Sequence, residues 1–147
     1  MKFFALMLLI VNSICGCAHS DSSNEAQTTA DGKAEYAKED AADFAAGKEA
    51  KVWLSDQNHV FFKVSKETVA KLTADLYAAG AAEVRVGKLD MERDLGNKEF
   101  GGNLVVKFPT DAGKRKSTFD AMNKFWKEAG DDPVADTGQA YASFSLD

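Results

Sequence analysis

The sequence predicts an α+β domain over residues 50–147. Two observations support this prediction. Short runs rich in valine, phenylalanine and tyrosine alternate with polar residues, which is typical of half-buried strands. Between these runs lie two longer segments whose apolar residues recur every three or four positions, as on one face of a helix. A domain of this size can bury enough apolar surface to be stable on its own.

The first predicted elements are two short strands followed by a helix. Lys51–Leu54 and Val60–Val64 are rich in β-forming side chains, and the polar turn between them suits a hairpin. Ser65 is a suitable N-cap for a helix that extends to about Ala79. Gly80 follows, and glycine is the residue type at which helices most often end.

Three further strands and a second helix are predicted in the rest of the chain. Glu83–Leu89 and Asn103–Phe108 alternate between apolar and polar residues, as strands do. A second amphipathic helix begins at Thr110 or Asp111 and ends at a glycine. After a turn formed by Asp-Asp-Pro, the last strand is predicted over Tyr141–Leu146.

The predicted element order is therefore β-β-α-β-β-α-β. Without the first strand, the order is βαββαβ, which is the ferredoxin-like split arrangement. We therefore expect a mainly antiparallel sheet with an extra N-terminal strand and with both helices on one face.

The N-terminal segment has the features of an export signal. Lys2 supplies a positive charge, and Phe3–Val11 form an apolar run. This run is too short to span a bilayer, which needs roughly 20 apolar residues. It fits the hydrophobic centre of a cleavable signal peptide.

The residues that end this segment, Ile14-Cys15-Gly16-Cys17, resemble the lipobox of bacterial lipoprotein precursors. The resemblance implies a signal peptide over residues 1–16 and acyl chains attached at Cys17, which would make the membrane a partner through lipid. In this family, an aspartate after the lipidated cysteine retains the protein at the inner membrane. Here that residue is alanine, so the resemblance implies the periplasmic side of the outer membrane in a Gram-negative cell. The alternative is ordinary secretion with cleavage after Ala18.

Residues 17–49 are predicted to form an acidic, flexible tether behind the lipidated cysteine. Residues 18–49 hold eight acidic residues against three lysines and few apolar side chains, so the ordering entropy of this segment is poorly offset. Alanine and glutamate are frequent enough for a short helix over residues 34–46, which Tyr36 and Phe44 could dock on the domain. Both cysteines of the chain lie in the leader, which fits an exported protein.

Several classes of function are excluded by composition and spacing. The domain carries 14 basic and 15 acidic residues, so no basic surface for nucleic acid is expected. Asp136-Thr137-Gly138 matches the aspartic protease tripeptide, but those enzymes need two such aspartates sharing a proton. No spacing of ligands predicts a metal site or a cofactor, and no set of side chains predicts a catalytic site.

One face of the predicted sheet is the candidate binding site. Alternation along the strands places aromatic and cationic side chains together there, which suits an anionic or ring-shaped ligand or a protein contact. The candidate residues are Trp53, Phe61, Lys63, Arg85, Lys107 and Tyr141. The alternative is that the N-terminal hairpin, the segment from Tyr36 to Phe44 or a second copy of the chain covers this face.

The leading functional hypothesis is a lipid-anchored envelope protein with a non-catalytic binding or interaction domain. Its partner would be another envelope protein or a second copy of the chain. Two alternatives remain open. One is a small envelope enzyme that uses His59 and the charged loop Asp90–Gly102, and the other is an inhibitor or immunity-type protein that blocks an enzyme through the same loop.

Overall fold

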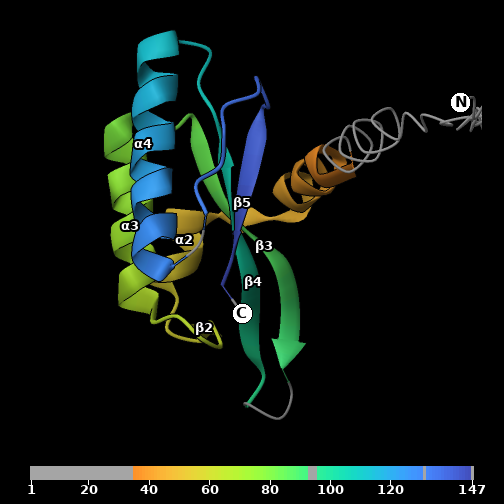
Figure 1. Ribbon diagram of the computed structural model, residues 1–147. Helices are drawn as coiled ribbons and strands as arrows, with labels where there is room; N and C mark the ends of the chain where they lie inside the picture. The colour runs from red at the N-terminus through yellow and green to blue at the C-terminus, as the bar shows by residue number, and fades with distance from the viewer. Residues whose placement is uncertain (1–34, 93–95, 131, 147) are drawn as a thin grey trace, which may run out of the picture.

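The computed structural model describes residues 35–92, 96–130 and 132–146, which form an α+β fold (Figure 1). This confirms the predicted fold class. Residues 35–46 form a helix that precedes the first strand. The elements that follow are β1 (Lys48–Glu49), α2 (Ala50–Ser55), β2 (His59–Val60), α3 (Lys66–Ala79), β3 (Glu83–Glu92), β4 (Lys98–Lys107), α4 (Ala112–Ala129) and β5 (Tyr141–Ser145).

The sheet has five strands and is mainly antiparallel. β3 lies between β1 and β4, and both pairings are antiparallel. The other edge of β4 is shared by β5, which is antiparallel, and by the short β2, which is parallel. In a ferredoxin-like sheet the last strand pairs with the first strand of the βαββαβ unit. Here β5 pairs with β4 itself, so the exact ferredoxin-like topology is not confirmed.

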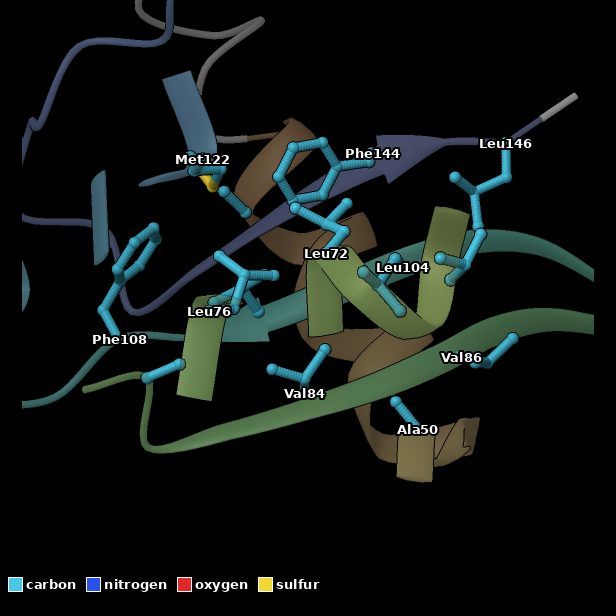
Figure 2. Close-up of a cluster of buried hydrophobic side chains, with 14 of the residues drawn as sticks. Ala50, Leu72, Leu76, Val84, Val86, Leu104, Phe108, Met122, Phe144 and Leu146 are labelled. Carbon is cyan, nitrogen blue, oxygen red and sulfur yellow. The ribbon is translucent and has the colours of Figure 1, made fainter. Parts of the chain in front are cut away.

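Helices cover both faces of the sheet. α3 and α4 lie side by side on one face, whereas residues 35–46 lie on the opposite face (Figure 1). The main core is between the sheet and α3 and α4, where apolar side chains from both layers meet (Figure 2). Its fully buried members include Leu76, Val84, Val86, Leu104, Val106, Met122, Phe144 and Leu146.

Both long helices begin and end as the sequence predicts. The side chain of Ser65 caps α3 by accepting a hydrogen bond from a backbone N–H of the first turn, and Asp111 does the same for α4. α3 stops at Gly80 with φ +106°, and α4 stops at Gly130 with φ +90°. Glycine reaches this left-handed conformation without the steric cost that a Cβ atom would add.

The predicted strand over Lys51–Leu54 is wrong, because these residues belong to α2. The β-branched and aromatic side chains in this run favour a strand locally. However, the Glu49 carboxylate accepts a hydrogen bond from Val52 N and caps a helix. The helix buries Trp53 and leaves Val52 exposed. The predicted strand would instead place Trp53 on the open face of the sheet. Burial of the indole ring outweighs the local propensity.

Two further expectations need correction. Of the predicted strand Val60–Val64, only Val60 lies in a strand, because β2 consists of His59 and Val60. The predicted loop Asp90–Gly102 is mostly strand, because β3 continues to Glu92 and β4 begins at Lys98. The two strands remain paired over this length and form a long hairpin. Charged residues near the turn suggested a loop because they lie where the hairpin is exposed to water.

The predicted signal peptide, Cys17 and the first part of the tether lie outside the described residues. Within the part of the chain that the structure describes, no helix combines the length and the apolar character needed to cross a membrane.

Candidate functional site

The candidate sheet face is covered by the helix of residues 35–46. This is one of the alternatives that the sequence left open. The ring of Phe44 is buried against this face and lies 4.7 Å from the Tyr141 ring, centroid to centroid. The guanidinium of Arg85 lies 4.6 Å from the centre of the Phe44 ring, and Lys107 Nζ lies 5.8 Å from it. Both cations therefore face an aromatic ring of the same chain.

Polar contacts hold the same helix to the sheet. Asn103 Nδ2 donates to Asp43 Oδ2 at 2.6 Å, and Ser143 Oγ donates to Asp40 Oδ1 at 2.5 Å. Arg85 adds hydrogen bonds to the carbonyl oxygens of Phe44 and Gly47, at 3.1 and 3.4 Å. The carboxylates and carbonyls of this helix thus meet amide, hydroxyl and guanidinium donors of the sheet.

Beside this helix, a groove of about 350 Å³ follows β5 at the edge of the sheet. We call it the β5 groove. Aromatic and small apolar side chains dominate its lining, with one carboxyl group and several hydroxyl and amide groups among them. The lining residues are Tyr36, Ala37, Asp40, Trp126, Val134, Ala135, Thr137, Gln139, Tyr141, Ala142 and Ser143. A concave, mainly apolar site with a few polar groups is typical of ligand pockets.

The edge of β5 that borders the groove offers unpaired backbone groups. Leu146 N donates to Gly102 O at 2.9 Å, so the even-numbered residues of this strand pair with β4. The N–H and C=O groups of Tyr141, Ser143 and Ser145 therefore point away from β4. Among the residues that the structure describes, no hydrogen bond reaches these outward groups. Such an edge can pair with another extended chain.

Asp40 is the acidic group of the groove. Burial raises the pKa of its carboxyl above the ordinary value, although the hydrogen bond from Ser143 acts in the opposite direction. The charges of the Asp43 and Glu39 carboxylates raise it further, and the charge of the Lys88 ammonium lowers it. A carboxyl with a perturbed pKa inside a groove is a candidate functional group.

The segment after α4 forms the outer wall of the groove and is well anchored. The Arg115 guanidinium binds both oxygens of Asp136, with the shortest contact at 2.6 Å, and also donates to Gln139 O at 2.8 Å. Asn123 Nδ2 donates to Val134 O, and Val134 N donates back to Asn123 Oδ1. The residues Asp136-Thr137-Gly138 form a tight bend in which Gly138 N donates to Asp136 Oδ1 at 3.0 Å. The groove therefore has a preformed wall on this side.

His59 lies in a separate polar cluster around β2 and the start of β4. Its Nδ1 is 2.7 Å from Trp53 O, its Nε2 is 3.2 Å from Glu99 Oε2, and its ring stacks on the indole at 4.6 Å. Trp53 Nε1 and Lys48 Nζ each donate to Glu99 at 2.6 Å. Burial alone would raise the pKa of Glu99, but these two hydrogen bonds, together with the charges of Lys48 and His59, outweigh it and lower the pKa. Both His59 nitrogens are occupied, which favours a structural role.

The structure separates the six candidate residues into two groups. Arg85, Lys107 and Tyr141 meet around Phe44, under the helix of residues 35–46. The other three lie away from that face. Trp53 is 1% exposed within α2, Phe61 packs on the core beside it, and Lys63 is exposed in the segment after β2. Tyr141 is the one member of the set that also lines the groove.

Sequence reasoning missed most of the groove, including Tyr36, Asp40 and Val134. Trp126, which also lines the groove, is next to Phe125 in the sequence. Helical spacing cannot decide between two adjacent aromatic residues, and in the structure the rings of both pack against Phe144. Among the described residues, no cluster of three or more histidine, cysteine, aspartate or glutamate side chains could hold a metal ion. The enzyme and inhibitor hypotheses stay predictions.

Comparison with known proteins adds no relative. No protein-family model, no curated protein and no solved structure matches this chain.

Proposed function

We propose that this chain is a lipid-anchored protein of the cell envelope whose domain binds a partner in the β5 groove and performs no chemistry on it. The observation that carries the binding function is the groove itself. It joins an apolar, aromatic lining to one half-buried carboxyl and to a strand edge that is unpaired among the described residues. These are groups that recognise and orient a partner.

The composition of the groove supports binding over catalysis. Asp40 supplies one carboxyl group, and its neighbours in the lining are hydroxyls, amides and aromatic rings. Nucleophilic catalysis by a hydroxyl needs an adjacent general base that is free to take its proton. The hydroxyl nearest to Asp40 is Ser143 Oγ, which donates to the carboxylate and at the same time holds the helix of residues 35–46 in place.

The proposed location rests on the sequence around Cys17. The lipobox-like residues Ile14-Cys15-Gly16-Cys17 suit attachment of more than one acyl chain, which gives a stable anchor. The acidic stretch that follows would place the domain away from the membrane surface, because anionic lipid surfaces repel it. We propose the periplasmic face of the outer membrane if the cell is Gram-negative.

Fractionation of the envelope tests the anchor. Cys17→Ala should move the protein from the membrane fraction to the soluble fraction, whereas the matched variant Cys15→Ala should leave it in the membrane. If Cys17→Ala stays membrane-bound, the lipid is not at that residue. If both variants and the native chain are soluble, the protein is secreted in the ordinary way.

Site-directed photocrosslinking in intact cells tests the groove. A photoreactive phenylalanine analogue at Tyr36, which is 70% exposed and lines the groove, should yield a discrete adduct. The same analogue at Val52, which is 71% exposed on α2, should not. The adduct should also disappear when Trp126 is replaced by alanine. Equal adducts at both positions, or none at Tyr36, would contradict a binding role for the groove.

A further inference from the structure

The β5 groove has two chemically different walls on either side of the outward edge of β5. Tyr36 and Asp40 come from the helix of residues 35–46, on the sheet face to which Ser143 points. Trp126 lies on the other face, where its ring packs on Phe144 at 4.6 Å. Successive side chains of a strand point to opposite faces of the sheet. A strand placed beside β5 would therefore present its side chains alternately to an acidic wall and to an apolar wall.

On the basis of the proposed binding function, we propose that the partner is an extended polypeptide segment of alternating basic and apolar residues, which adds to β5 as a further strand. Its backbone would pair with the outward N–H and C=O groups of Tyr141, Ser143 and Ser145. Its basic side chains would reach Asp40 and the ring of Tyr36, and its apolar side chains would pack on the opposite wall.

Charge complementarity selects a basic segment. The helix of residues 35–46 carries four acidic residues, namely Glu35, Glu39, Asp40 and Asp43, against one lysine, Lys38. Asp40 is hydrogen-bonded to a neutral hydroxyl, that of Ser143. A lysine or arginine side chain in the groove would place a cation next to this carboxyl and would also meet aromatic faces, which attract cations.

β5 lacks two of the sequence devices that usually block strand addition. Its sequence, Tyr-Ala-Ser-Phe-Ser, contains no charge and no proline. The strand at the opposite edge, β1, has two residues, and both are charged. A second copy of the chain is disfavoured at β5, because antiparallel pairing of two copies would bring their acidic helices to the same face of one continuous sheet.

Hydrogen exchange on the full-length protein with defined peptides tests this inference. The main probe is a peptide of about seven residues that alternates lysine and valine. Three matched peptides serve as controls. One replaces lysine with glutamate, one has the same composition in two blocks, and one is N-methylated along the pairing edge. The lysine–valine peptide should slow exchange at the amides of Tyr141, Ser143 and Ser145 at least tenfold, and the three controls should not.

Protein variants separate the contribution of charge from that of shape. Asp40→Asn should weaken binding of the lysine–valine peptide about tenfold, because it removes a partly buried charge partner. The matched variant Glu39→Gln, on the same helix but outside the groove lining, should leave binding within about twofold. Equal loss in both variants would indicate general electrostatic attraction and would overturn recognition in the groove.

Each of the remaining outcomes would overturn one or both proposals. Binding without protection of the three outward amides would overturn strand addition. Protection of those amides before any peptide is added, together with a dimer in sedimentation, would show that a second copy occupies the edge. Absence of binding by the lysine–valine peptide, while photoadducts at Tyr36 persist in cells, would overturn the proposed partner chemistry and leave the binding function intact. Absence of both would overturn the two proposals together.

Discussion

The two faces of the sheet are held to their covering helices by different forces. Toward α3 and α4 the strands present apolar side chains such as Val84, Leu104 and Phe144, all fully buried. Toward residues 35–46 they present Arg85 and Asn103 beside the buried Val105, and the contacts to this helix include hydrogen bonds and an aromatic ring. Apolar burial contributes stability roughly in proportion to area, whereas each buried hydrogen bond contributes little net but is costly to break. The face toward α3 and α4 therefore contributes most of the stability, and the face toward residues 35–46 fixes where that helix docks.

The largest effect should follow a change on the apolar face. Phe144→Ala removes a ring that is 1% exposed and that contacts Phe125 and Trp126. We expect the free energy of unfolding to fall by about 3–5 kcal/mol, because a cavity is left among rigid neighbours. Denaturant titration measures this loss. Ser145→Ala, on the same strand but exposed, is the control and should change stability by less than about 0.5 kcal/mol.

A smaller effect is expected on the polar face. Asp43→Ala leaves the amide of Asn103, which is 3% exposed, without its acceptor. The free energy of unfolding should fall by about 1–3 kcal/mol, the cost of an unsatisfied buried donor. Glu39→Ala is the matched control, since its ion pair with Lys88 is half-exposed on both sides and is worth at most about 1 kcal/mol. Equal losses from the two variants would contradict a special role for the Asn103 contact.

A pH dependence of opposite sign to that of most carboxyls is expected from Asp40. Burial raises the pKa of Asp40 in the folded protein, so the folded state binds a proton there more tightly than the unfolded chain does. Its contribution to stability is therefore full below the unfolded pKa and declines as the pH rises through the folded pKa. The stability of the Asp40→Asn variant, measured relative to the native chain, should therefore increase as the pH rises. An unchanged difference between pH 3 and pH 7 would contradict this sign.

The charged groups that face Asp40 are Asp43, Glu39 and Lys88, so the comparison must use the difference between variant and native chain. The pKa of Glu99 is lowered in the separate cluster around His59, and its stabilisation is lost as the pH falls through its folded pKa. That background has the opposite sign and cancels in the difference.

The smallest effect on stability is expected at the rim of the groove. Tyr36 is 70% exposed, so Tyr36→Ala should change the free energy of unfolding by less than about 0.5 kcal/mol. The same variant should weaken binding of the lysine–valine peptide several-fold, because an aromatic face for the cation is lost. A large stability loss would show that this residue is part of the packed helix and not a free wall.

Local sequence signals were sufficient to predict an element where nearby residues alone determine its bounds. The caps at Ser65 and Asp111 and the glycines after each helix act within a few residues, and α3 and α4 were predicted correctly for that reason. α2 was missed because the cap at Glu49 and the burial of Trp53 compete with local β propensity, and burial depends on the whole fold.

The groove could not be predicted from the sequence because long-range contacts assemble it. Asp40 and Ser143 are separated by 103 positions, and neither sits in a motif. Residues 35–46 also have the acidic composition of a flexible segment, so their docking depends on Phe44 finding a partner surface that only the folded sheet provides. The sequence named this segment as one of three possible covers of the sheet face, but it could not choose among them.

The position of residues 35–46 in the chain has a mechanical consequence. They lie between the N-terminal end of the chain and the sheet, so they are in series with any tension that pulls on that end. Such a load reaches the contacts at Asp40, Asp43 and Phe44 before it reaches the apolar core. These contacts can be peeled away one at a time, and one wall of the β5 groove departs with them. A load on the N-terminal end would therefore act first on the wall against which a partner would rest.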